Sequence, residues 1–153
     1  MSGEMRPWKQ DTWTSNNVGT HGSKSSGGGE SQISVGELGE FGLIARVTAR
    51  LPLGAGTLVG PGDDAAVVSA SDGRVVATTD LLVDGQHFRR DWSTPYDVGR
   101  KAAAQNLADV AAMGAVPTAL LIGLATPADL PAFWAERFAD GLADECAIVD
   151  AGV

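Results

Sequence analysis

The sequence is poor in features on which several protein classes depend. It has one cysteine, Cys146, in 153 residues, so an internal disulfide is impossible, and no Cys/His pattern suits a zinc site. Lysines and arginines number 11 against 19 aspartates and glutamates, and the net charge of -8 argues against a nucleic-acid partner. No apolar run reaches the ~18 residues that span a bilayer or forms a secretory leader. We therefore expect a soluble, cytoplasmic protein that attracts cations and has no membrane partner.

Two parts of the chain differ in composition. Residues 1–33 are rich in Gly, Ser, Thr and Asn, and they have no apolar periodicity. Such a segment cannot bury enough apolar surface to offset the entropy lost on ordering. The rest of the chain has the apolar content of one ordinary domain. The sequence thus predicts a disordered Gly/Ser-rich tail over residues 1–33 and one domain over residues 34–153.

Three helices are predicted from start and stop signals. The first follows Ser34 and Glu37, which have the spacing of a capping box, and its apolar pattern ends at Pro52. The second covers residues 94–113, from a Thr-Pro start to a following glycine. The third covers residues 131–145.

Short β-prone runs alternate with these helices. Residues 65–68 and 75–79 are predicted to form a hairpin through the Asp-Gly turn at residues 72–73. Residues 118–125 have the length and apolarity of a buried strand, and another strand is predicted to begin at residue 147. The order indicates an α+β fold with a mostly antiparallel or mixed sheet packed by helices. We expect the chain to be truncated, since its last strand has barely begun when the sequence ends.

Acidic residues fall at the ends of the predicted elements. Asp63 and Asp64, in GPGDDAAVV, precede one strand, Asp80 ends another, and Asp109 lies within the second helix. Two carboxylates about 4 Å apart repel by roughly 4 kcal/mol at an effective dielectric constant near 20. Converging acids therefore favour a hard divalent cation such as Mg²⁺, which commonly binds substrate phosphates as well. The alternative for the Asp63-Asp64 pair is a solvated turn.

Two further features bear on a site. The second helix carries Lys101, Gln105 and Asp109 at intervals of four residues, with Asn106 beside them, and alanines surround this polar stripe. We expect the stripe to face a pocket. His87, in DGQHF, has no partner in the sequence, and by itself it is more typical of a packed or surface histidine.

Four segments together resemble a known family. They are GEFGLIARV, GPGDDAAVV, TTDLLVDGQHF and KAAAQNLADVAAMGAVPTALLIGLATP. In this order and spacing, the chain from about Gly39 onward resembles the N-terminal half of thiamine-monophosphate kinase, in the superfamily named for aminoimidazole ribonucleotide synthetase. The resemblance implies ATP-dependent phosphorylation of thiamine phosphate to thiamine diphosphate, with Mg²⁺ as cofactor. It implies metal ligands at Asp64, Thr78, Thr79, Asp80 and Asp109, and a substrate contact at His87.

The resemblance also carries expectations for the whole protein. It implies a homodimer formed through the N-terminal domains, a Gly-Gly-Asp motif shortly after Val153, and a C-terminal α/β domain, so the chain alone should have little or no kinase activity. Two alternatives stay open. One is another enzyme of the superfamily, of the selenophosphate synthetase or hydrogenase-maturation type. The other is a non-catalytic module for metal binding or dimerisation.

Overall fold

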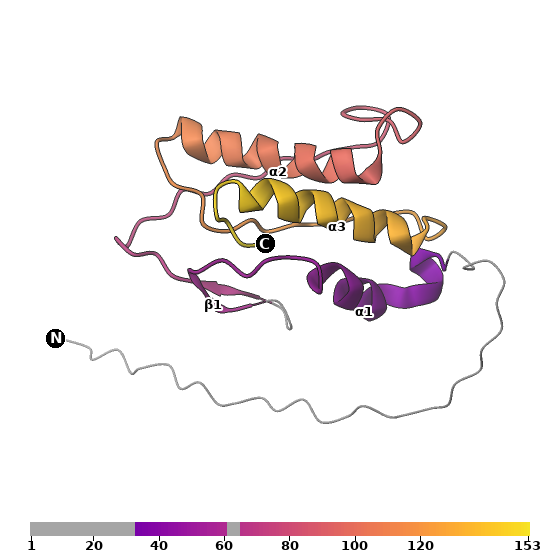
Figure 1. Ribbon diagram of the computed structural model, residues 1–153, viewed down its shortest axis with the longest axis horizontal. Coiled ribbons are helices and arrows are strands. Elements are labelled where there is room, and N and C mark those ends of the chain that lie inside the picture. The colour runs from indigo at the N-terminus through magenta and orange to yellow at the C-terminus, as the bar shows by residue number, and fades with distance from the viewer. Residues whose placement is uncertain (1–32, 61–64) are drawn as a thin grey trace, which may run out of the picture. The chain divides into compact units, whose positions relative to one another are not determined.

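The computed structural model describes residues 33–60 and 65–153, which belong to one compact unit of the chain. Their elements, in order, are α1 (Val35–Thr48), β1 (Thr57–Val59), β2 (Val67–Val68), α2 (Pro95–Ala112) and α3 (Ala132–Ala147) (Figure 1). The tail predicted over residues 1–33 lies outside the described residues, apart from its last position. None of the described helices has both the length and the apolar character needed to cross a membrane.

The helix pair α2 and α3 contains most of the core. Thr94 caps α2, and its hydroxyl accepts a hydrogen bond of 3.2 Å from the Asp97 amide. The two helices lie side by side (Figure 1) and bury a shared set of side chains: Val98, Ala103, Leu107, Phe138, Leu142 and Cys146. Cys146 is fully buried, and this burial raises the pKa of its thiol to about 11.

Two glycines set the distance between these helices. A Cβ atom at Gly99 would lie 2.0 Å from the Phe138 carbonyl oxygen, and one at Gly141 would lie 2.1 Å from that of Tyr96. Backbone therefore meets backbone at this crossing, which only glycine permits. On α2, this contact at Gly99 lies about one turn before the alanines that surround the polar stripe.

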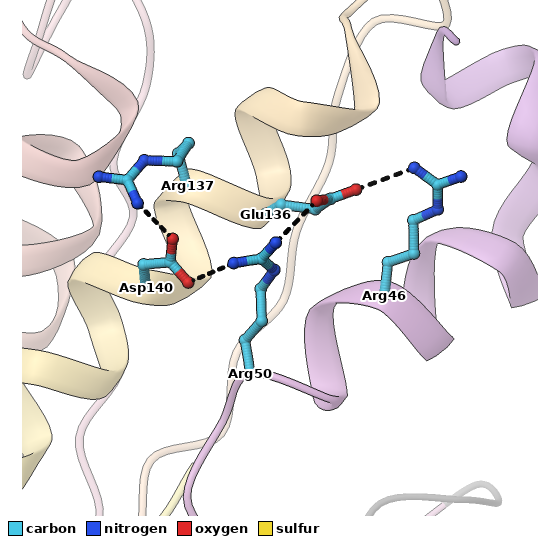
Figure 2. Close-up of polar contacts among 5 residues, drawn as sticks. All are labelled: Arg46, Arg50, Glu136, Arg137 and Asp140. Carbon is cyan, nitrogen blue, oxygen red and sulfur yellow. Dashed lines mark hydrogen bonds and ion pairs between the residues drawn. The ribbon is translucent and has the colours of Figure 1, made fainter. Parts of the chain in front are cut away.

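Polar contacts attach the α1 helix to α3 and to the segment just before it. Its first amide, of Val35, donates to the Leu130 carbonyl at 2.8 Å. Farther along, Arg46 and Arg50 form ion pairs with α3 (Figure 2). Gly39 interrupts the helix with a φ of 72°. The predicted apolar face is therefore only partly buried, and Phe41 is 85% exposed.

The helices were predicted more accurately than the strands. Residues 65–68 contain β2, but β2 pairs antiparallel with β1, with Thr57 opposite Val68. The predicted hairpin partner, residues 75–79, forms no strand in the described structure, so that pairing is wrong. The Asp-Gly signal still marks a turn, since Gly73 has a φ of 73° and its amide donates to the Ala70 carbonyl.

The other two strand predictions need similar correction. Residues 118–125 form one isolated parallel β-bridge, between Ala119 and Gly152. They do not form a strand in the described structure. Residue 147 ends α3, and the Val149 amide donates to the Cys146 carbonyl at 3.2 Å, so the chain turns here. A strand requires a neighbour that accepts its backbone hydrogen bonds, whereas a turn satisfies them locally. The described residues thus agree with the α+β class, but their sheet has two short strands.

Candidate metal and substrate site

The polar stripe of α2 meets the extended segment of residues 78–80. The Thr78 hydroxyl donates to Asp109 Oδ2 at 3.3 Å. One turn earlier on the helix, Gln105 Nε2 donates to Asp80 Oδ2. Residues four apart on a helix share a face, so Gln105 and Asp109 present their side chains to the same segment. Two of the predicted ligand carboxylates are thereby placed along one edge of α2.

Asn106 holds the backbone of the same segment. Its side-chain amide donates to the Ala102 carbonyl at 2.9 Å, while its Oδ1 accepts from the Asp80 amide at 3.2 Å. Both hydrogen bonds are made by the planar side-chain amide of Asn106, so the bond to Ala102 fixes the direction in which Oδ1 faces Asp80. Asp80 is therefore held at its main chain by Asn106 and at its carboxylate by Gln105. The sequence signalled both residues through the polar stripe, but it did not indicate their contact with Asp80.

The DGQHF motif forms a compact turn that fixes His87. Gly85 has a φ of 80°, and its amide donates to the Phe88 carbonyl at 2.8 Å. His87 Nδ1 accepts a hydrogen bond of 3.0 Å from the Val83 amide. A neutral imidazole that accepts at Nδ1 carries its proton on Nε2. The turn thus gives His87 a structural role, which sequence reasoning missed, and leaves Nε2–H as a donor.

This turn is tied to the rest of the domain from two sides. Lys101 Nζ donates to the His87 carbonyl at 2.5 Å, so the stripe of α2 contacts the turn as well as residues 78–80. The Phe88 ring stacks on Trp134 of α3, with centroids 6.3 Å apart. Next to the turn, Arg90 pairs with Asp84 at 2.6 Å. The position of His87 is therefore set by contacts with α2 and α3.

A cavity of about 430 Å³ opens beside the segment. Thr79, Asp80 and Asn106 form part of its polar lining, and leucines and aromatic side chains supply much of the rest. Asn106, which lies beside the stripe, lines this cavity, but Lys101, Gln105 and Asp109 do not, so the stripe itself does not face it as expected. The side chain of Asp109 is exposed.

The predicted ligands are brought together only in part. Thr78 contacts Asp109, Asp80 is held one helical turn away, and Thr79 lies at the cavity. Asp63 and Asp64 lie outside the described residues. Within residues 33–60 and 65–153, no group of three or more His, Cys, Asp or Glu side chains is arranged to hold a metal ion. The donors present are all oxygen atoms, which is the chemistry that Mg²⁺ requires.

Comparison with known proteins places the chain in a family. The model of the AIR synthase related protein, N-terminal domain, matches residues 62–153. A thiamine-monophosphate kinase of Mycobacterium tuberculosis is 53% identical over 117 residues, which are 76% of this chain and 35% of that protein. The corresponding kinase of Corynebacterium glutamicum is 44% identical over 110 residues, 71% of this chain and 32% of the relative.

A more distant relative shows the same pattern. The thiamine-monophosphate kinase of Escherichia coli K12 is 43% identical over 108 residues, which are 69% of this chain and 33% of that protein. The chain thus spans about a third of the length of the curated relatives that it matches. The resemblance to the N-terminal part of thiamine-monophosphate kinases is confirmed. The chain belongs to the AIR synthase related proteins and carries their N-terminal domain.

Proposed function

We propose that the intact protein to which this chain belongs phosphorylates thiamine phosphate to thiamine diphosphate in the cytoplasm, with ATP as phosphoryl donor. The observation that carries the proposal is the identity of 53% to a protein named thiamine-monophosphate kinase, extending through the segments that form the site. The geometry supports it, because Asp80 and Asp109 lie along one edge of α2. The Thr78 hydroxyl links the extended segment of residues 78–80 to Asp109 on the helix.

The residues of this chain have distinct parts in the proposal. Thr78, Thr79, Asp80 and Asp109, together with Asp64, would hold Mg²⁺. Bound there, Mg²⁺ would neutralise phosphate charge and align donor and acceptor. His87 would donate from Nε2 to the acceptor substrate, because Nδ1 is occupied by the Val83 amide. The acceptor is already an anionic phosphate near neutral pH, so the reaction needs no strong general base.

The test is a phosphoryl-transfer assay of the intact protein with ATP and thiamine phosphate. Asp80→Asn keeps the shape of the side chain and removes its charge, so we expect a fall in rate on the order of 100-fold or more. Asp72→Asn is a matched control, because Asp72 lies in an exposed turn and pairs with Arg74 at 2.6 Å. A wild-type protein inactive on thiamine phosphate but active on another acceptor would replace the proposal with another superfamily reaction.

A second measurement addresses the non-catalytic alternative. Mg²⁺ affinity, measured by calorimetry on the wild type and on Asp80→Asn, should fall in the variant because one anionic ligand is lost. Equal affinities would remove Asp80 from the ligand set. Magnesium binding without any phosphoryl transfer would indicate a metal-binding module.

A further inference from the structure

We propose that Gln105 is a positioning residue, which orients the Asp80 carboxylate for a divalent cation without neutralising it. The inference rests on the proposed function, and it deepens the description of that site. The juxtaposition that carries it is the hydrogen bond from Gln105 Nε2 on α2 to Asp80 Oδ2 on the extended segment.

Asp80 depends on this contact for its orientation. Its side chain is exposed, and the segment around it is neither helix nor strand in the described structure. Within the described residues, Gln105 is the only side chain hydrogen-bonded to the Asp80 carboxylate. Without that bond, the carboxylate is free to rotate about both of its side-chain torsions. A ligand that must be ordered at the moment of binding loses affinity to the entropy of ordering.

The backbone of α2 that carries Gln105 is held in place by core packing. Gln105 is half-buried, and Ala103 and Leu107, on either side of it in α2, are core residues with exposed fractions of 0% and 7%. The helix at this point is held against α3, so the amide donor has a fixed origin. Asn106, the next residue, fixes the Asp80 main chain through the 3.2 Å bond to its amide. Two consecutive amide side chains thus determine both the place and the direction of Asp80.

The neutrality of the donor matters for the cation. A carboxylate has about four acceptor positions, and one hydrogen bond at Oδ2 leaves the others available. A lysine or arginine donor would orient Asp80 equally well, but its charge would compete with Mg²⁺ for the same carboxylate. The cationic residue of the stripe, Lys101, donates instead to the His87 carbonyl. Asp80 thus accepts a hydrogen bond from the neutral side chain of the stripe, while the cationic Lys101 side chain contacts the turn.

The experiment measures Mn²⁺ binding to the intact protein, without ATP, by electron paramagnetic resonance. Gln105→Leu removes the donor at similar size, and Gln105→Lys retains a donor but adds charge. We expect both variants to bind Mn²⁺ about 10-fold or more weakly, as is typical when a partner of a metal ligand is lost. In the kinase assay, each should need more Mg²⁺ for half-maximal rate, while the rate at saturating Mg²⁺ changes less.

Controls separate positioning from a general effect on folding. The control variant Gln86→Leu makes the same amide-to-leucine change at an exposed residue. The Gln86 side chain makes no hydrogen bond in the described structure, so this variant should bind Mn²⁺ as tightly as the wild type does. Urea midpoints of the Gln105 variants should stay close to that of the wild type. Wild-type Mn²⁺ affinity in Gln105→Leu would overturn the inference, and full affinity in Gln105→Lys would overturn the argument from neutrality.

The outcome is distinguishable from failure of the proposed function. If Mn²⁺ binds and the binding depends on Gln105, but thiamine phosphate is not phosphorylated, the positioning role stands and the kinase assignment falls. If the protein transfers phosphate and Gln105→Leu leaves both Mn²⁺ affinity and Mg²⁺ dependence unchanged, the positioning role falls and the kinase assignment stands.

Discussion

At the scale of single residues, Gly99 is the position where a small change should have a large effect. A Cβ there would lie 2.0 Å from the Phe138 carbonyl oxygen and 3.0 Å from the Leu142 amide nitrogen. Both atoms belong to the backbone of α3, so the steric clash can be relieved only if the two helices move apart. We expect Gly99→Ala to lower the free energy of unfolding by about 3 kcal/mol, at the upper end for overpacked cores. Urea denaturation followed by circular dichroism measures this loss.

Gly123→Ala is the matched control for this change. A Cβ at Gly123 meets no atom within 4 Å, so the same substitution should have little effect on stability there. Equal urea midpoints for the two variants would mean that α2 and α3 do not touch through their backbones at Gly99.

Residue by residue, the site could be predicted in part from the sequence. The stripe of Lys101, Gln105 and Asp109 follows from helical periodicity, but the sequence did not indicate the contacts of Gln105 and Asn106 with Asp80. The hydrogen-bond partner of each side chain could not be predicted. Lys101 binds the His87 carbonyl and Val83 binds His87 Nδ1 because of the path of one turn, and that path depends on the φ of Gly85.

At the scale of elements, the start of α2 should depend on pH. Asp97 accepts hydrogen bonds from the Thr94 hydroxyl and amide, and these bonds lower the pKa of its carboxyl below the ordinary 3.8. The unfolded chain therefore takes up the proton first as the pH falls. The stabilisation is present above the ordinary pKa and is lost as the pH falls through the lower folded-state value.

Asp97→Asn tests this contribution, because it keeps the shape and removes the charge. We expect the wild type to have the higher urea midpoint at pH 7, and the difference between the two proteins to shrink toward pH 3. The control is Asp129→Asn, which changes an exposed aspartate for which no side-chain hydrogen bond occurs in the described structure. A difference that stays constant between pH 7 and pH 3 would contradict a role for the Asp97 charge.

The attachment of α1 should depend on salt. Arg50 lies between two acids of α3 (Figure 2). Its guanidinium nitrogens are 2.9 Å from a carboxylate oxygen of Glu136 and 2.7 Å from one of Asp140. Arg46 pairs with Glu136 and Arg137 pairs with Asp140, so the five residues form one network. We expect Arg50→Met to weaken this attachment by about 1 kcal/mol, the upper end for partly exposed pairs.

Hydrogen exchange of the α1 amides measures this effect. Exchange should be faster in Arg50→Met than in the wild type at low salt, and the difference should narrow in 1 M NaCl because salt screens exposed charges. Arg74→Met is the control, since Arg74 pairs with Asp72, two residues away within one turn. Unchanged α1 exchange in Arg50→Met would show that two backbone hydrogen bonds suffice to hold α1, from the Val35 amide to the Leu130 carbonyl and from the Gly36 amide to the Ala128 carbonyl.

Helices and strands differ in how far the sequence determines them. The helix predicted over residues 94–113 is found at Pro95–Ala112, and the one predicted over 131–145 at Ala132–Ala147. Helix hydrogen bonds and caps lie within the segment, so local residues suffice to specify them. Residues 75–79 and 118–125 have strand-like composition, but a strand also needs a partner, and its identity is not encoded locally.

At the scale of the whole molecule, the extended residues 75–81 and 118–125 leave apolar surface uncovered. Val75 is 77% exposed, Leu81 76% and Leu121 84%. Residues from 79–84 and from 121–127 line the same cavity, so the two regions lie near each other. Extended backbone without a sheet neighbour pairs readily with another chain. Exposed apolar patches of this kind mark interaction surfaces.

We therefore expect the intact protein to be a homodimer in which these regions of two copies meet, as the family resemblance implies. Leu121→Lys places a charge in the contact, and it should raise the dimer dissociation constant by about 10-fold or more, equivalent to about 1.4 kcal/mol. Phe41→Lys is the matched control, because Phe41 is 85% exposed on α1, outside both regions. Sedimentation equilibrium measures both constants. A monomeric wild type, or equal constants for Leu121→Lys and Phe41→Lys, would mean that the exposed residues of these regions do not form the interface.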